Sequence, residues 1–188
     1  MHNLPTIYLA SKSPRRKQLL EASAIPFKLL ELDIEETYPV DLTIEEVPEF
    51  LALKKARAAL EIKTDGIILA ADSIVVMDGQ IFEKPTSRAH AIDIIHALAG
   101  NTHVVITGVC LMSTGRTVHF SDHSEVHLAS MSSEEIEWYV DTYKPFDKAG
   151  AYGIQDWIGH CKVDRIVGSY NNIMGLPTHR VYEELANF

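Results

Sequence analysis

An almost unbroken apolar segment, residues 66–77, constrains the fold more than any other part of the chain. Such a run is typical of a strand buried on both faces, which requires helices on both sides of a sheet. It is broken once, by Asp72 and Ser73. A carboxylate inside such a strand is costly unless it is paired or binds a metal ion. Asp72 is therefore the most informative residue, and an Asp that caps a turn at a strand end is the alternative.

The rest of the chain interleaves strand-like and helix-like segments. Strands are predicted at 7–10, 26–32, 103–112, 118–129 and 163–167, with a hairpin turn at Asp78-Gly79. Helices are predicted at 14–23, from 43 or slightly later to about 60, at 87–98, at 134–143 and from about 177 onward. Residues 144–159 and 168–176 are predicted to be irregular. This pattern predicts an α/β fold with a mixed sheet and packed helices, in which catalytic residues lie on loops at strand ends.

Size and composition indicate one globular domain, with two lobes as the form we expect for residues 1–188. Apolar residues make up 46% of the chain, yet no run approaches the ~20 residues needed to span a bilayer. The two cysteines form no disulfide framework and no zinc spacing, which fits a reducing cytoplasm.

The formal net charge of −9 argues against nucleic acid or a membrane surface as a partner. Against this acidic background, the basic clusters at 12–17 and 54–57 stand out. A focused anion site is the interpretation that we favour.

The segment 8–17 is the first candidate for that site. A strand leads into a helix that begins at Pro14, with Ser13 as the expected N-cap and Ser11 as a second hydroxyl. Free N–H groups at the helix start and cations that include Arg15 and Arg16 favour a phosphate. A solvated basic first turn is the alternative.

Carboxylates and single polar residues supply the other candidates. Glu35 and Glu36 with Asp72 would suit Mg²⁺ or Mn²⁺, although on the residues alone a solvated acidic loop is preferred. Lys84, before Pro85, could neutralise a phosphate or lie on the surface. For Lys55 a solvated helix face is the favoured interpretation. Gln155 could hydrogen-bond a base edge or belong to an ordinary packed loop.

Taken together, six motifs in order resemble the Maf family of nucleoside triphosphate pyrophosphatases. They are Ala10-Ser11-Lys12-Ser13-Pro14-Arg15-Arg16, Lys55-Ala56-Arg57-Ala58, Ala71-Asp72-Ser73, Glu83-Lys84-Pro85, Asp147-Lys148-Ala149-Gly150-Ala151-Tyr152-Gly153-Ile154-Gln155, and Gly168-Ser169-Tyr170 with Gly175-Leu176-Pro177. The resemblance implies a fold with a deep central cleft, related to the inosine-triphosphate pyrophosphatases. It also implies hydrolysis of a nucleoside triphosphate to the monophosphate and pyrophosphate.

The same resemblance assigns roles to residues. Asp72 would accept the proton, Arg15, Ser73 and Gln155 would lie at positions that determine substrate choice, and Glu36, Lys55 and Lys84 would match the remaining functional positions. For the mechanism, we expect Glu36 and Asp72 to hold a divalent metal ion, or Asp72 to orient the water, while Lys55 and Lys84 supply positive charge. Ser11, Ser13 and Arg16 complete the expected substrate-binding set, with the two serines contacting phosphate or backbone. The Ala-Tyr-Gly-Ile-Gln pattern resembles that of the Maf-family branch that acts on dTTP and UTP. The expected role is the removal of standard or modified pyrimidine nucleotides.

The sequence departs from the family pattern at one position and leaves two questions open. Ser73 stands where the family usually has Thr, which affects base selectivity rather than the reaction. A non-catalytic nucleotide-binding regulator of septum formation is the alternative function. The oligomeric state is open, with a homodimer as one expectation.

Overall fold

The computed structural model describes residues 4–188, which divide into two compact units. The first unit consists of the chain up to Asp72 together with Thr107–Asp122 and Gly175–Phe188. The second unit consists of Ser73–Ile106 and His123–Met174. The chain therefore passes between the units within three of its strands and again before its last helix.

One mixed sheet contains the seven strands of the described chain: β1 (Ile7–Leu9), β2 (Phe27–Leu29), β3 (Ile67–Met77), β4 (Gln80–Phe82), β5 (Thr102–Met112), β6 (Thr117–Leu128) and β7 (Val163–Val167). The order is β2-β1-β3-β5-β6-β7, with β4 paired to β3. β1 is parallel to both β2 and β3, whereas β4 and β7 are antiparallel to their partners. The predicted mixed α/β sheet is confirmed.

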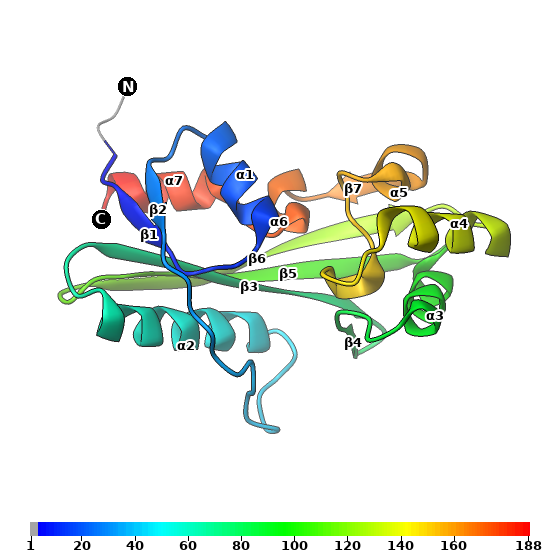
Figure 1. The fold of residues 1–188 in the computed structure, drawn as a ribbon. Coiled ribbons are helices and arrows are strands. Elements are labelled where there is room, and N and C mark those ends of the chain that lie inside the picture. The colour runs from blue at the N-terminus through cyan, green and yellow to red at the C-terminus, as the bar shows by residue number, and fades with distance from the viewer. Residues whose placement is uncertain (1–3) are drawn as a thin grey trace. The chain divides into compact units, whose positions relative to one another are not determined.

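Helices cover the sheet within the first unit on both faces, as the apolar run of β3 requires. The helices of the described chain are α1 (Pro14–Ala22), α2 (Val47–Ile62), α3 (Arg88–Leu98), α4 (Ser133–Tyr143), α5 (Trp157–Cys161), α6 (Tyr170–Met174) and α7 (Thr178–Ala186), with a 3-10 turn at Ala149–Ala151. In the first unit, α2 lies on one face of the sheet and α1 and α7 lie on the other (Figure 1). In the second unit, α3 packs against α4 and the 3-10 turn.

Each unit has its own apolar core. In the first unit, small side chains of α2 pack against β3 and β5; the buried residues are Ala10, Ala52, Ala56, Ala59, Ile68, Ala70, Cys110 and Met112. In the second unit, larger side chains from α3 and α4 fill the core, among them Ile95, Leu98, Ile136 and Tyr139. The small residues of α2 let its axis approach the sheet closely, and this closeness positions the site described below.

Two local predictions are wrong in detail. Residues 144–159 contain the 3-10 turn and α5, and residues 168–176 contain α6, so neither stretch is irregular throughout. The hydroxyl of Ser13 makes no capping hydrogen bond to α1. The later of the two predicted starts of α2 is confirmed, because the helix begins at Val47, after a turn in which Thr43 donates hydrogen bonds to Glu46. Helices of five residues offer too few positions for a periodic pattern to be recognised.

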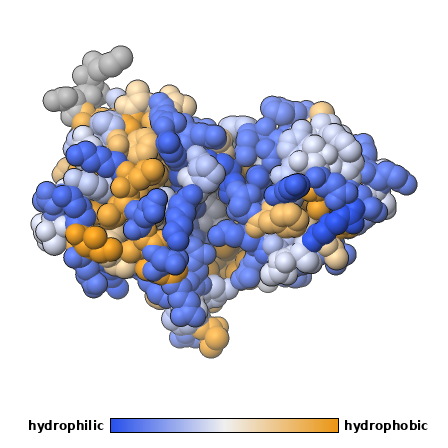
Figure 2. Space-filling model, viewed as in Figure 1, coloured by the Kyte–Doolittle hydropathy of each residue, from blue (hydrophilic) through white to orange (hydrophobic). Residues whose placement is uncertain are grey.

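The surface is mixed in character. Hydrophilic and apolar residues are interspersed on the face that Figure 2 shows. Within residues 4–188, none of the helices has both the length and the apolar character that crossing a membrane requires.

Candidate active site

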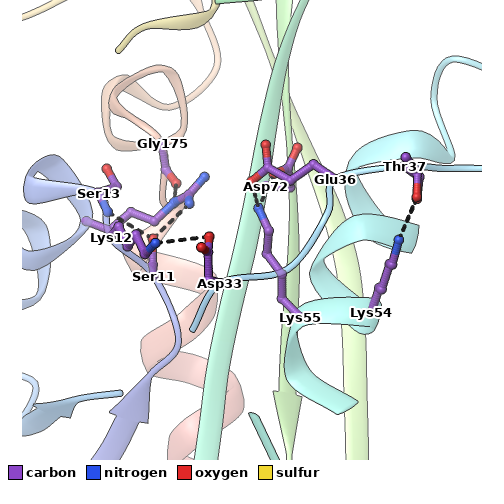
Figure 3. Close-up of polar contacts among 11 residues, drawn as sticks. Ser11, Lys12, Ser13, Asp33, Glu36, Thr37, Lys54, Lys55, Asp72 and Gly175 are labelled. Atoms are coloured by element: carbon purple, nitrogen blue, oxygen red, sulfur yellow. Dashed lines mark hydrogen bonds and ion pairs between the residues drawn. The ribbon is translucent and has the colours of Figure 1, made fainter. Parts of the chain in front are cut away.

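Three charged side chains of the first unit meet at one point, and we call them the Lys55 cluster: Lys55, Glu36 and Asp72. The Lys55 ammonium donates hydrogen bonds to Asp72 Oδ1 at 2.5 Å and to Glu36 Oε1 at 2.6 Å (Figure 3). Lys55 and Asp72 are buried, with 9% and 8% of their surface exposed, whereas Glu36 is exposed. One ammonium thus joins carboxylates from an extended loop and from the middle of a strand.

The position of Asp72 in β3 explains how a carboxylate is tolerated there. Side chains alternate along a strand, so Asp72 lies on the same face as Ile68 and Ala70, which pack against α2. Lys55 comes from that helix and supplies the counter-charge that a buried carboxylate needs. Because Asp72 lies well inside Ile67–Met77, the alternative that it caps a turn at a strand end is wrong.

Gly108 in β5 allows the first turn of α2 to lie against the sheet. A Cβ at this position would overlap the backbone of Pro48 and Glu49. The Glu49 carboxylate lies 2.6 Å from His119 Nδ1 and accepts a hydrogen bond from Ser121 at 3.1 Å, both on β6. The start of α2 is therefore fixed on two strands, and Lys55 follows about two turns later.

Replacing Gly108 with Ala should displace the first turn of α2, because the new methyl group overlaps main-chain atoms that cannot rotate away. We expect a loss of about 1–3 kcal/mol in the free energy of unfolding, measured by urea denaturation. Gly115→Ala is the matched control, since no heavy atom lies within 4 Å of the added Cβ. Equal unfolding midpoints for the two variants would contradict this packing.

The segment between β1 and α1 is held by Arg16 rather than by a capping serine. Arg16 Nε donates to the carbonyl oxygen of Gly175 at 2.8 Å, and Nη1 donates to Ser11 Oγ at 3.1 Å. Ser11 Oγ also accepts the backbone N–H of Ser13 at 3.2 Å. Arg16 is buried, with 8% exposed, whereas Arg15 is half-buried. Arg16 therefore ties this segment to the chain that precedes α7.

Electrostatic coupling links this segment to the Lys55 cluster. Burial is the largest influence on the pKa of Arg16 and lowers it. The Asp72 carboxylate raises that pKa, Arg15 lowers it, and Glu36 raises it. The buried guanidinium and the two carboxylates thus act on one another within the first unit, so residues 11–16 and the Lys55 cluster share one electrostatic environment.

Lysine contacts hold the acidic loop on both sides of Glu36. Lys12 pairs with Asp33 at 3.1 Å, and Lys54 Nζ donates to the carbonyl and hydroxyl oxygens of Thr37 at 2.9 and 3.0 Å (Figure 3). Exposed contacts of this kind add at most about 1 kcal/mol each to the free energy of unfolding. Their main effect is to set the path of the loop that carries Glu36. Glu36 consequently reaches Lys55, while its neighbour Glu35 is exposed.

Three predicted residues belong to the second unit. Ser73 is half-buried and follows Asp72 on β3, so alternation directs its side chain to the opposite face. Lys84 is exposed and follows β4. Gln155 is half-buried, and its Oε1 is buried without a hydrogen-bond partner among the described residues. That these three share one site with the Lys55 cluster remains a prediction.

Glu36 and Asp72 supply carboxylate oxygens, the ligand type that Mg²⁺ and Mn²⁺ prefer. Among residues 4–188, no three or more His, Cys, Asp and Glu side chains are grouped so that they could hold a metal ion. Mg²⁺ usually takes only one or two carboxylates and completes its octahedron with water and substrate phosphate. Glu36 and Asp72 supply that number of carboxylates, and that they hold a metal ion remains a prediction.

Sequence reasoning missed residues that position the candidates. The sequence pattern does not indicate that Gly108 matters, because the close contact that requires a glycine is with a helix about 60 residues earlier in the chain. Tyr139, which hydrogen-bonds the turn that carries Gln155, and Asp156 within that turn were also missed. Tyr139 lies on the apolar face of α4, where the pattern alone indicates an ordinary core residue.

Comparison with known proteins gives consistent matches along the chain. A family model described as Maf-like protein matches residues 6–188. A dTTP/UTP pyrophosphatase of Phocaeicola vulgatus is 49% identical over 95% of this chain and 94% of its own. A dTTP/UTP pyrophosphatase of Bacteroides thetaiotaomicron is 45% identical with the same coverage. Among solved structures, a HAM1 protein from Coxiella burnetii aligns with 68% of this chain and 75% of its own, with a TM-score of 0.49 and 20% identity.

Proposed function

The chain belongs to the Maf family, and from this premise we propose that it hydrolyses nucleoside triphosphates, dTTP and UTP before others, to the monophosphate and pyrophosphate. The observation that carries the proposal is the Lys55 cluster in the electrostatic environment of residues 11–16. Removal of standard or modified pyrimidine triphosphates in the cytoplasm is the role that we infer.

The triphosphate would bind to the segment that starts α1. The Ser11 and Ser13 hydroxyls, the Arg15 guanidinium and the first N–H groups of α1 are donors suited to phosphate oxygens. Arg16 lies among them, but its hydrogen bonds to Gly175 and Ser11 favour a positioning role. Lys84 would add a point charge to the same triphosphate.

The Lys55 cluster would carry the chemistry. Glu36 and Asp72 would hold Mg²⁺ or Mn²⁺, which neutralises charge on the triphosphate and makes an attacking water more acidic. Asp72 would orient that water and take its proton on Oδ2, because Oδ1 already accepts a hydrogen bond from Lys55. Water adds to the α-phosphorus, the bond to the bridging oxygen breaks in line, and pyrophosphate leaves. Lys55 would fix both carboxylates and offset their charge.

The base would be recognised by residues of the second unit. Uracil and thymine present an N3–H donor beside a carbonyl acceptor, and the amide of Gln155 offers the complementary pair. The buried Oε1 without a protein partner supports this role, since a substrate donor would satisfy it. Ser73 would contribute its hydroxyl nearby.

A substrate panel tests the proposal. Purified protein with Mg²⁺ or Mn²⁺ is given dTTP, UTP, CTP, ATP, GTP and modified pyrimidine triphosphates, and the products are identified. We expect pyrophosphate and monophosphate, with kcat/KM highest for dTTP and UTP, and loss of turnover when EDTA removes the metal. Tight binding of UTP without turnover would instead support the alternative, a non-catalytic regulator of cell division.

A further inference from the structure

The turn that carries Gln155 is held by a buried tyrosine from another element. Tyr139 in α4 has no exposed surface. Its hydroxyl accepts the backbone N–H of Gly153 at 3.1 Å and donates to Asp156 Oδ2 at 3.0 Å. The turn is closed by the Asp156 N–H, which donates to the carbonyl oxygen of Gly153 at 3.0 Å. One hydroxyl therefore fixes the residues on both sides of Gln155.

The protonation state of this hydroxyl suits both of its bonds. Burial raises the pKa of Tyr139, and the Asp156 carboxylate raises it further. The hydroxyl keeps its proton, so it can donate to a carboxylate while it accepts an N–H. Asp156 also lies 3.8 Å from Lys148 Nζ, which pairs at 2.9 Å with Asp147.

Asp156 lies beside the amide that would meet the base. A Cβ added at Gly153 would lie 2.5 Å from Asp156 Oδ2 and 3.0 Å from Gln155 Nε2, so the carboxylate oxygen and the amide nitrogen lie on the same side of this glycine. A carboxylate on that side favours the NH₂ end of the amide toward itself. The opposite end, Oε1, is the buried oxygen without a protein partner.

Amide orientation decides which pyrimidine a glutamine can pair with. Uracil and thymine offer N3–H and O4, whereas cytosine offers N3 as an acceptor and an amino donor at C4. Rotating the amide by 180° exchanges its acceptor and its donors, so a free glutamine could pair with either base. Selective binding of uracil and thymine over cytosine therefore requires contacts that favour one orientation of the glutamine amide.

We propose that Tyr139 and Asp156 select this orientation: Tyr139 clamps the turn and holds Asp156, and the negative charge of Asp156 on the Nε2 side of Gly153 favours the Gln155 amide with its oxygen toward the N3–H of the base. This inference rests on the proposed function. Both are positioning residues, because neither is assigned a contact with the substrate. Their effect should appear in base selection and not in the chemical step.

The test measures kcat/KM for UTP and for CTP in the full-length chain. We expect Asp156→Asn and Tyr139→Phe each to lower the UTP-to-CTP ratio at least about tenfold, mainly through KM, with kcat for UTP within a few-fold of wild type. Tyr152→Phe and Asp164→Asn are the matched controls. The Tyr152 hydroxyl bonds the buried His103 and Asp164 is exposed on β7, so both variants make the same chemical change without removing a hydrogen bond or ion pair of the turn. Both should keep the ratio within about twofold of wild type.

A second readout separates positioning from loss of fold. Hydrogen exchange at the Gly153 amide should speed up in Tyr139→Phe and stay slow in Tyr152→Phe, because only the former loses the acceptor of that N–H. A wild-type preference for UTP that persists in Asp156→Asn and Tyr139→Phe would overturn this inference alone. A wild-type chain that hydrolyses neither nucleotide would overturn the proposed function and this inference with it.

Discussion

Asp72→Asn is expected to lower kcat for UTP by at least about a thousandfold while the chain stays folded. The asparagine keeps the size of the side chain and can still accept a hydrogen bond from Lys55. It can no longer take a proton from water, and it offers a weaker ligand to a divalent cation. Pyrophosphate release at saturating UTP measures the effect, and urea denaturation verifies the fold.

Asp78→Asn is the matched control for that variant. Asp78 lies in the hairpin turn after the same strand, with φ of 52°, a conformation that asparagine also adopts readily. We expect near-normal turnover from this control. Near-normal turnover from Asp72→Asn as well would refute the assignment of Asp72 as proton acceptor.

Lys55→Met should damage both stability and activity. Methionine fills much of the same volume, but it leaves the buried Asp72 carboxylate without the ammonium that lies 2.5 Å away. Removing one partner of a buried ion pair costs about 3–5 kcal/mol. We expect a loss near the lower end, because Glu36 is exposed and Arg16 still acts on Asp72. The kcat for UTP should fall at least about a hundredfold.

Lys54→Met provides a sharp control, since the two lysines are consecutive on α2. Lys54 is exposed and contacts Thr37 on the acidic loop instead of a carboxylate. Its replacement should change the free energy of unfolding by less than about 1 kcal/mol and leave kcat within a few-fold of wild type. If Lys54→Met and Lys55→Met were equally active and equally stable, the Lys55 cluster would have no role in the reaction.

The strands and the need of Asp72 for a partner were predictable because their signals are local. The long apolar run of β3 identifies a buried strand, and its single interruption marks the residue that needs a partner. The motifs also predicted the family, which the family model confirms over residues 6–188. The hairpin was also predictable from Asp78-Gly79, and the helix that follows it was predictable from the pattern of residues 87–98.

The partner of Asp72 was not predictable from pattern alone. The sequence pattern favours a solvated helix face for Lys55 and a solvated loop for Glu36. It does not show which face of α2 packs against the sheet near Asp72. Gly108 in β5 lets the first turn of α2 lie against the sheet. Likewise, the contacts of Arg16 with Gly175 and of Tyr139 with Gly153 join residues distant in sequence. Only the folded chain reveals such contacts.

The position of bond cleavage tests the central claim most directly. UTP is hydrolysed in H₂¹⁸O with Mg²⁺, and the products are analysed by mass spectrometry. Attack at the α-phosphorus predicts one ¹⁸O atom in UMP, none in pyrophosphate, and no release of orthophosphate. Label in pyrophosphate or orthophosphate, or the absence of any turnover, would contradict the proposed reaction.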